Sequence, residues 1–322
     1  MKKILLTNRY SGRPLEIVRE ETPEGFALCF LPEQSPEALL QAAPEADYIL
    51  AGGRLPVTGE VLEKASRLKM IQRSGVGLDS LDLDAIREKG IPLYVNQGVN
   101  AESVAEHTLL LILACLRRLT EIDRNTRQGV WKKQEQGIRT AELRGKTVGI
   151  IGMGHIAKRL AELLQPFGVT ILYHNRSRAD ADFEQRFGLR FTELDELLTR
   201  SDVVTLHCAL APETRHLIRE ETIARMKPGA VLVNTARGGL VEPIALAQAL
   251  RSGKISFAGL DVHAEEPIGA EYPLKDLNNV ILTPHVAGVT ADSFRAMMHD
   301  AFRNIRCFDE GRTEEIQASR YC

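Results

Sequence analysis

The sequence contains no apolar stretch long enough to cross a membrane. Its longest uninterrupted apolar run, residues 109–116, is far shorter than the ~20 residues that a membrane-spanning helix needs, so we expect a buried helix there. We also expect no secretory signal, because Asn8, Arg9 and Gly12 interrupt the short apolar run that follows two lysines at the amino terminus. We therefore expect a protein that is neither inserted in a membrane nor secreted.

Cysteine is scarce, and neither sign of charge dominates. The five cysteines are far apart and form no C-x-x-C motif, which favours reduced thiols in a cytoplasmic protein over a disulfide framework. The 41 lysines and arginines are balanced by 43 acidic residues. Nucleic acids and anionic membranes bind basic faces, so we expect neither as a partner. We also predict no metal site.

What the sequence does contain is a regular alternation of short apolar runs and helix-like segments. Its 322 residues suggest two domains, since domains usually have roughly 100–200 residues. Thr58 is typical of a helix start and Gly90 of a helix stop. Strands are expected at 4–6, 26–30, 48–51, 70–71 and 92–95, and helices at 36–43, 58–68 and 81–89. This order predicts a parallel sheet with helices on both faces.

The alternation restarts after a long apolar helix, expected at residues 101–119, that joins two regions of the chain. About six strands follow, separated by helices, and a last helix is expected at 292–308. The strands are expected at 147–151, 169–173, 203–206, 231–233, 258–260 and 280–282. The fold class is therefore α/β, with two doubly wound parallel-sheet domains.

The first of these later strands leads into a glycine-rich turn. Gly152, Gly154 and Ala157 fit the pattern G-x-G-x-x-(G/A) between a strand and a helix, which is the context of a dinucleotide site. Gly152 permits the tight turn, and Gly154 lets the backbone approach a pyrophosphate. The helix start at His155 and Ile156 presents N–H groups to the phosphates.

The second strand of this region ends without an acidic residue. An NAD site usually has Asp or Glu there, bound to the ribose 2′-hydroxyl, whereas this chain has Asn175, Arg176, Ser177 and Arg178. A carboxylate would repel a 2′-phosphate, while guanidinium groups would bind it. We therefore favour NADP over NAD.

Three polar segments follow later strands and contain an arginine, a glutamate and a histidine. They are residues 233–239 with Arg237, 260–267 with Glu266, and 282–288 with His285. In open α/β sheets, the loops after the carboxyl ends of the strands form the ligand crevice. These three side chains are therefore expected to converge beside the nicotinamide.

These segments resemble the signature motifs of the D-isomer-specific 2-hydroxyacid dehydrogenases. The resemblance covers nearly the whole chain and extends to residues 74–79, 100–106 and 226–230. It implies a Rossmann dinucleotide domain, residues 100–285, inserted into a flavodoxin-like substrate domain. That substrate domain would comprise residues 1–99 and 286–322, and the protein would be a homodimer.

The resemblance also implies roles for individual residues. His285 would exchange a proton with the substrate oxygen, and Glu266 would hold His285 and favour its protonated form. Arg237 would bind the carboxylate and polarise the carbonyl. Asp261 would contact the nicotinamide end of the cofactor. Backbone N–H groups in the loop formed by Ser74, Gly75, Val76 and Gly77 would bind the substrate carboxylate.

The expected activity is reduction of a small 2-keto acid, such as glyoxylate or hydroxypyruvate. One alternative is a D-3-phosphoglycerate dehydrogenase of serine synthesis. Because the chain ends at Cys322, we expect no long C-terminal regulatory domain of the kind that some such enzymes carry. Another alternative is a dinucleotide-sensing, corepressor-like binding protein. Pocket residues of the first domain, Arg54 among the candidates, would select the substrate.

Overall fold

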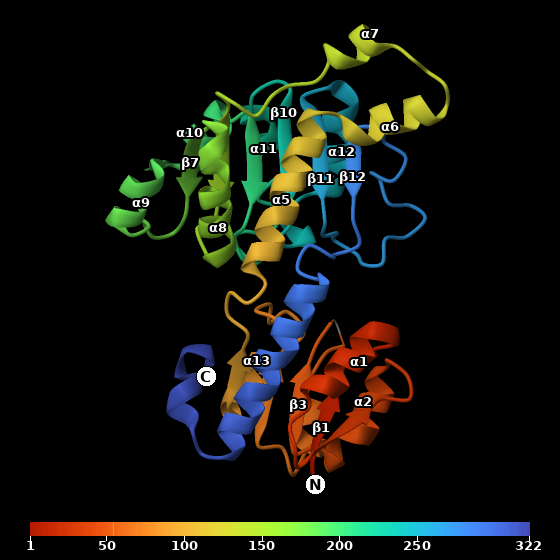
Figure 1. Cartoon of the computed structure of the whole chain (residues 1–322), viewed down its shortest axis with the longest axis vertical. Helices are drawn as coiled ribbons and strands as arrows, with labels where there is room; N and C mark the ends of the chain where they lie inside the picture. The colour runs from red at the N-terminus through yellow and green to blue at the C-terminus, as the bar shows by residue number, and fades with distance from the viewer. Residues whose placement is uncertain (54) are drawn as a thin grey trace. The chain divides into compact units, whose positions relative to one another are not determined.

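The computed structural model describes residues 1–53 and 55–322, which divide into two compact units. Unit 1 comprises Met1–Asn100 and Val289–Cys322, and unit 2 comprises Ala101–Gly288 (Figure 1). Unit 2 is thus an insertion in the chain of unit 1. The sequence predicts boundaries after residues 99 and 285, whereas the structure assigns residue 100 to unit 1 and residues 286–288 to unit 2.

Unit 1 is built on a parallel sheet of five strands in the order β2-β1-β3-β4-β5. This is the flavodoxin-like order, in which the chain reverses direction across the sheet between β1 and β3. The strands are β1 (Lys2–Leu6), β2 (Phe26–Phe30), β3 (Tyr48–Ala51), β4 (Met70–Arg73) and β5 (Leu93–Val95).

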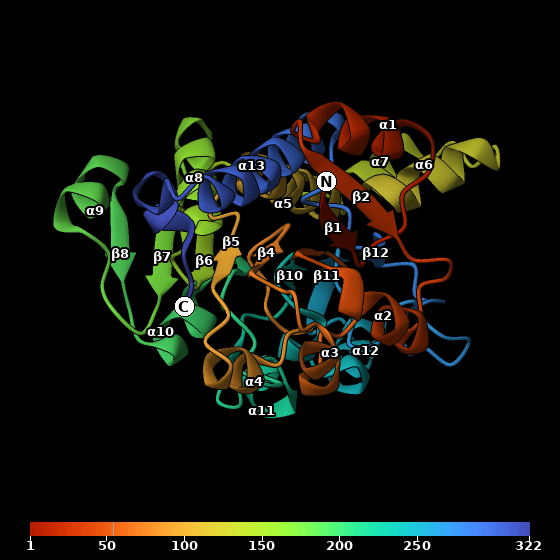
Figure 2. The same cartoon turned by 90° about the horizontal axis from the view of Figure 1, so that it is seen from below.

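Helices cover both faces of this sheet (Figure 2). Ile4 and Leu6 of β1 pack with α1 and α13, while Leu5 packs with α2, α3 and α4. Because both faces are covered, the central strands are mostly apolar, as expected for a parallel sheet. The helices are α1 (Gly12–Glu21), α2 (Pro36–Ala42), α3 (Gly59–Lys64), α4 (Leu83–Glu88) and α13 (Ala291–Asp309), with short 3-10 turns η1 (Ala43–Glu45) and η4 (Thr313–Ser319).

Unit 2 is built on a parallel sheet of seven strands in the order β12-β11-β10-β9-β6-β7-β8. The chain runs outward from β6 to β8 and then returns to β9 beside β6, as in the Rossmann fold. Its strands are β6 (Thr147–Ile151), β7 (Thr170–His174), β8 (Leu189–Phe191), β9 (Val203–Leu206), β10 (Ala230–Asn234), β11 (Ile255–Leu260) and β12 (Val280–Leu282). Together, the two sheets confirm the predicted fold class.

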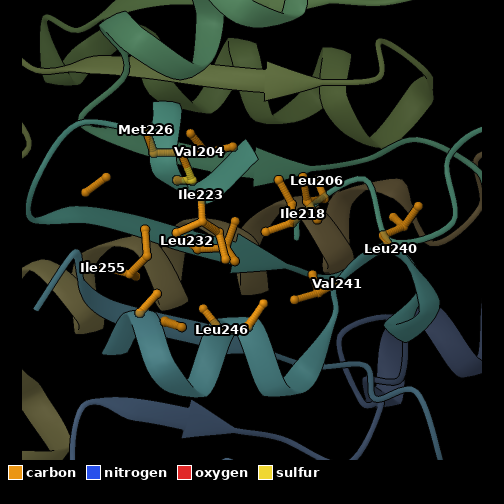
Figure 3. Packing of buried hydrophobic residues seen from close by; sticks show 14 of the residues in the cluster. Val204, Leu206, Ile218, Ile223, Met226, Leu232, Leu240, Val241, Leu246 and Ile255 are labelled. Atoms are coloured by element: carbon orange, nitrogen blue, oxygen red, sulfur yellow. The ribbon is translucent and has the colours of Figure 1, made fainter. Parts of the chain in front are cut away.

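The core of unit 2 has two layers, one on each face of the sheet. Val231 and Val233 of β10 pack with α5 and α8, and Leu232 packs with α11 and α12. Figure 3 shows the second layer, in which Leu232 lies with Ile223 and Leu246. The helices are α5 (Ala101–Leu116), α6 (Leu119–Arg127), α7 (Lys133–Gly137), α8 (His155–Leu164), α9 (Ala181–Phe187), α10 (Leu194–Arg200), α11 (Glu220–Arg225) and α12 (Pro243–Ser252), with 3-10 turns η2 (Gln165–Phe167) and η3 (Gly238–Leu240).

Two predicted features of unit 2 were wrong. The long helix was expected to reach residue 119, but α5 ends at Leu116 and α6 begins at Leu119. Between them Arg118 has a left-handed backbone with φ of 52°, held by the ion pair of Arg118 with Glu121. The strand count was also too low, because β8 is a short edge strand whose middle residue, Arg190, is exposed.

The described part of the chain holds neither a membrane-spanning helix nor a metal-binding group of side chains. In residues 1–53 and 55–322, no helix combines the length and apolar character that a membrane crossing requires, and no group of three or more His, Cys, Asp or Glu side chains is arranged to hold a metal ion. All five cysteines are free thiols in this structure, and their reduced state in a cell stays a prediction.

Candidate active site

Gly152 turns the chain from β6 into α8. This turn lies where the strand order of the unit 2 sheet reverses, between β6 and β9. The φ of Gly152 is +94°, and its N–H donates to the carbonyl oxygen of His174 at 2.8 Å. A Cβ atom at this position would lie 2.5 Å from the backbone nitrogen of Cys208 and 2.6 Å from the carbonyl carbon of His207. Both the backbone angle and the packing therefore require glycine.

The start of α8 has the properties of an anion site. Gly154 is the N-cap and supplies no side-chain cap, and a Cβ atom there would meet nothing within 4 Å. Within the described residues, no protein acceptor bonds the N–H groups of His155, Ile156 and Ala157. Free N–H groups and the helix dipole favour a phosphate at this position. The turn therefore fits the pyrophosphate of a dinucleotide.

His207 lies beside this turn without adding a charge to it. It follows β9, and its Nε2 is 2.9 Å from the Thr205 hydroxyl. Burial lowers the pKa of His207 to about 4, because the surroundings disfavour the charged imidazolium. At neutral pH the positive potential at the turn therefore comes from the helix and not from this histidine.

The two arginines after β7 have different surroundings. Two nitrogens of Arg178 donate hydrogen bonds to the Glu184 carboxylate, at 2.9 Å and 2.7 Å. This hydrogen bonding holds the pKa of the Glu184 carboxyl below its usual range. Glu184 is buried and also accepts a hydrogen bond from Tyr173. Arg176 is exposed and has no ion pair or hydrogen bond to any other described residue.

The other two residues at this strand end shape the loop. The Asn175 side-chain amide donates to the carbonyl oxygen of Ser177 at 2.9 Å. Arg178 is already paired with a carboxylate, so Arg176 is the better placed of the two guanidinium groups to meet an added phosphate.

Arg237 follows β10, and its loop lies directly against the loop after β11. A Cβ atom on Gly238 would lie 1.9 Å from the carbonyl carbon of His263, so no other residue fits between the two main chains. The Asn234 amide donates to the Arg237 carbonyl oxygen at 2.8 Å, and one terminal nitrogen of Arg237 donates to the Ala236 carbonyl at 2.7 Å. The backbone on both sides of Arg237 is therefore fixed.

Glu266 and His285 form a hydrogen-bonded pair. His285 Nδ1 is 3.0 Å from Glu266 Oε2, and the other carboxylate oxygen of Glu266 accepts the backbone N–H of His263 at 2.6 Å. The Glu266 side chain is 11% exposed and that of His285 is 45% exposed. An ionised carboxylate only accepts hydrogen bonds, so Nδ1 carries a hydrogen. Nε2 is then the ring nitrogen that can exchange a proton with a substrate.

The main chain of His285 is unusual, because it is left-handed with φ of 59°. Its N–H donates to the Asp261 carbonyl oxygen at 2.7 Å. The Asp261 carboxylate accepts the next two N–H groups, from Val286 at 3.0 Å and Ala287 at 2.9 Å. Asp261 is completely buried, so it supports the loop of His285 from inside. A contact between Asp261 and the cofactor stays a prediction.

In the loop from Ser74 to Gly77 of unit 1, three carbonyl groups accept hydrogen bonds, and the N–H of Ser74 donates to the carbonyl oxygen of Ala51 at 3.0 Å. Asn96 bonds the carbonyl oxygens of Ser74 and Gly75, and Arg73 Nε bonds that of Gly77 at 2.7 Å. The N–H groups of Gly75, Val76 and Gly77 have no acceptor in the described chain. Such a run of free N–H groups is a site for an anion.

Sequence reasoning missed the residues that hold this loop. Asn96 is 2% exposed, receives a hydrogen bond from Gln72 and donates to the carbonyl oxygen of Met297 on α13. Their positions at strand ends could have indicated a role at the site, since Asn96 directly follows β5 and Arg73 ends β4. Arg54, a candidate pocket residue by sequence, lies outside the described residues.

Residues 109–287 match the model of a protein family, the NAD binding domain of the D-isomer specific 2-hydroxyacid dehydrogenases. Glyoxylate reductase from Aeropyrum pernix is 41% identical over 86% of this chain and 84% of its own length. Hydroxypyruvate reductase from Thermotoga maritima is 37% identical, covering 80% and 83%. D-3-phosphoglycerate dehydrogenase from Mycobacterium leprae is 40% identical over 83% of this chain, which spans only 50% of that longer protein.

Comparison with solved structures points to the same family over nearly the full length of this chain. The chain resembles D-lactate dehydrogenase from Aquifex aeolicus, determined with NAD and lactic acid, with a TM-score of 0.86, 30% identity and 99% of each chain covered. Together with the matched family model, this likeness confirms the predicted resemblance. The protein belongs to the D-isomer specific 2-hydroxyacid dehydrogenase family and is an oxidoreductase that acts on 2-hydroxy acids with a nicotinamide dinucleotide.

Proposed function

We propose that this protein reduces small 2-keto acids, with glyoxylate and hydroxypyruvate as the preferred substrates and NADPH as the preferred cofactor. The observation that carries the proposal is the His285–Glu266 pair at 3.0 Å, which supplies a proton donor beside the fixed loop of Arg237. The substrate class follows the relatives named glyoxylate reductase and hydroxypyruvate reductase.

When bound, a nicotinamide dinucleotide would supply the hydride for the carbonyl carbon. The chain's own residues bind the substrate and manage the proton. His285 Nε2 donates a proton to the developing alkoxide, and the negative charge of Glu266 stabilises the imidazolium before that transfer. Arg237 binds the substrate carboxylate and polarises the carbonyl through its planar fork of donors. The free N–H groups of the loop 74–77 bind a carboxylate oxygen.

The two alternative functions, a phosphoglycerate dehydrogenase and a corepressor-like protein, have unequal support from the similar proteins. D-3-phosphoglycerate dehydrogenases are among the similar proteins, so 3-phosphohydroxypyruvate belongs in any substrate comparison. The corepressor-like alternative has no specific observation in its favour, because the similar proteins named above are enzymes.

We expect the purified protein to oxidise NADPH with glyoxylate and hydroxypyruvate, and to use NADH with a kcat/KM lower by about tenfold or more. One charge-assisted hydrogen bond to the 2′-phosphate, about 1.5–3 kcal/mol, gives this ratio. The measurement is steady-state absorbance at 340 nm over a panel that includes pyruvate and 3-phosphohydroxypyruvate. The highest kcat/KM for 3-phosphohydroxypyruvate would replace our substrate assignment, and tight cofactor binding without turnover on the panel would favour the corepressor-like role.

The cofactor preference has its own variant. Arg176→Ala is expected to raise the KM for NADPH about tenfold and to leave the KM for NADH unchanged. Arg190→Ala removes an exposed arginine from the neighbouring strand β8 and serves as the matched control. Equal losses with both cofactors, or no loss with either, would remove Arg176 from 2′-phosphate recognition.

We also propose that the protein is a homodimer formed through the segment from α5 to α7. This segment exposes an unusual set of large apolar side chains. They are Leu110, Leu119, Val130, Trp131 and Ile138, with Trp131 81% and Ile138 87% exposed. Exposed apolar groups that gather in one region mark interaction surfaces. Sedimentation equilibrium is expected to give twice the chain mass of 35.7 kDa, and serine at both Trp131 and Ile138 is expected to shift it toward one chain. A wild-type mass of one chain at assay concentration contradicts the proposal.

A further inference from the structure

A chain of hydrogen bonds leads from helix α5 to the loop that carries His285. It begins at His107, whose Nε2 lies 3.2 Å from the hydroxyl oxygen of Thr283. The Thr283 hydroxyl in turn lies 2.5 Å from Asp261 Oδ1. His107 is partly buried, with 17% of its side chain exposed, and its Nε2 is also 3.7 Å from the same carboxylate oxygen. Of the three residues linked by these hydrogen bonds, only Asp261 was predicted to have a role in the active site.

The direction of each hydrogen bond in this chain is determined by chemistry. A hydroxyl has one hydrogen, and at 2.5 Å that of Thr283 points to the Asp261 carboxylate. Toward His107 the Thr283 oxygen can therefore only accept, so His107 Nε2 carries a hydrogen and donates it. This arrangement fixes both the tautomer of His107 at Nε2 and the rotation of the Thr283 hydroxyl.

Asp261 is the point at which this chain reaches the catalytic loop. One residue accepts three consecutive backbone N–H groups, from His285 through its carbonyl oxygen and from Val286 and Ala287 through its carboxylate. Thr283 binds the same carboxylate through its hydroxyl. A fully buried carboxylate needs such partners, because each one offsets part of the cost of leaving water.

His285 needs this support because its backbone is strained. Residues with a side chain rarely adopt the left-handed region, and φ at His285 is 59°. Such a conformation persists only where the surrounding structure determines it from several sides. The main-chain carbonyl oxygens of Asp261 and Thr283 both accept the N–H of His285. The Asp261 carboxylate, which also accepts the Thr283 hydroxyl, binds the next two N–H groups and so holds the loop directly after His285.

We propose that His107 is a positioning residue for catalysis: by donating from Nε2 to Thr283 it orients Asp261, and Asp261 holds His285 in its left-handed turn. The inference rests on the proposed function in so far as His285 is the proton donor. It assigns His107 no contact with substrate, cofactor or the reacting atoms.

The test compares variants that remove or keep the Nε2 donor. His107→Phe keeps a ring but removes the donor, and Thr283→Val removes the hydroxyl while keeping its shape. Each is expected to lower kcat about 10- to 100-fold, as expected for one buried hydrogen bond in a network, with little change in the KM for the keto acid. His107→Gln places an amide N–H near the same point and is expected to restore kcat to within a few-fold of wild type.

The hydrogen bonds from His107 through Thr283 to Asp261, called the relay below, also predict non-additive effects of substitutions on kcat. They further predict a change in the hydrogen exchange of backbone amides. The double variant should lose little more activity than either single variant, because both break the same chain. Amide hydrogen exchange at residues 285–287 should accelerate in both single variants. Ser201→Ala removes another buried hydroxyl of unit 2, which bonds Leu197 at 2.6 Å, and should leave kcat and these amides unchanged. If His107→Phe does not fold, Thr283→Val alone decides the question.

Two results would overturn the relay: kcat within twofold of wild type in His107→Phe or Thr283→Val, or unchanged exchange at residues 285–287 in these variants. Loss of kcat in His107→Gln equal to that in His107→Phe would also overturn it, because the donor would then not be the cause. If the wild-type protein turns over none of the keto acids, the proposed function fails. The exchange measurement still tests the relay in that case.

Discussion

Replacing His285 with alanine should lower kcat for keto-acid reduction by about 10³-fold, while the affinity for the dinucleotide stays near the wild-type value. A positioned general acid contributes roughly 10²–10⁴-fold to rate, and water would have to replace it in the variant. The His285 side chain is hydrogen-bonded to Glu266, whereas the cofactor turn is formed by Gly152 and the start of α8. The measurements are kcat with glyoxylate and a fluorescence titration with NADPH.

The chain provides a closely matched control for this variant. His299 Nδ1 lies 3.0 Å from Glu21 Oε2, which reproduces the distance and the atoms of the His285–Glu266 pair, but both residues belong to unit 1. His299→Ala should therefore keep kcat within about twofold. Near-normal turnover in His285→Ala would show that another group delivers the proton.

The second large effect is expected from Arg237→Lys. Lysine keeps the positive charge but loses the planar fork, which forms two parallel hydrogen bonds with a carboxylate or carbonyl. Two charge-assisted hydrogen bonds, each about 1.5–3 kcal/mol, correspond to a loss of about 10²–10⁴-fold in kcat/KM. Both kcat and KM for the keto acid should change, because Arg237 is proposed to bind the substrate and to polarise it.

Arg200→Lys provides the comparison for this substitution. Arg200 is an exposed arginine at the end of α10 in the same unit, ion-paired with Glu196, and its replacement should leave both constants unchanged. If Arg237→Lys alters KM alone, the guanidinium binds substrate but does not assist the chemistry. A kcat/KM within threefold of wild type would remove Arg237 from both roles.

The parts of the site that the sequence could predict are those encoded by local patterns. The turn at Gly152 is recognisable because small residues, an apolar strand and an apolar-periodic helix occur side by side in the chain. Gly152 and its neighbours need no distant partner to be interpreted. The alternation of strands and helices likewise predicts both parallel sheets, apart from the short edge strand β8.

Other features depend on partners that no local pattern indicates. Arg178 reads as a free cation in the sequence, yet the fold pairs it with Glu184 on α9. Asp261 reads as a loop residue, yet its carboxylate lies among N–H groups from a segment more than twenty residues away. The helix break at Arg118 depends on Glu121 and on the stacking of its guanidinium over Phe257, 5.5 Å from the ring centre. These contacts follow from the tertiary fold and cannot be derived from spacing.

The close approach of Gly238 to His263 has a consequence for how the site changes over time. The loops of Arg237 and Glu266 meet main chain to main chain, with no side chain between them. Substitutions at nearby positions can therefore accumulate without altering the spacing of these two loops, since that spacing is set by backbone atoms that every amino acid shares. Substitution of Gly238 itself is not tolerated, because any side chain there would push the two loops apart. The spacing of these two loops thus depends on one residue that has no side chain.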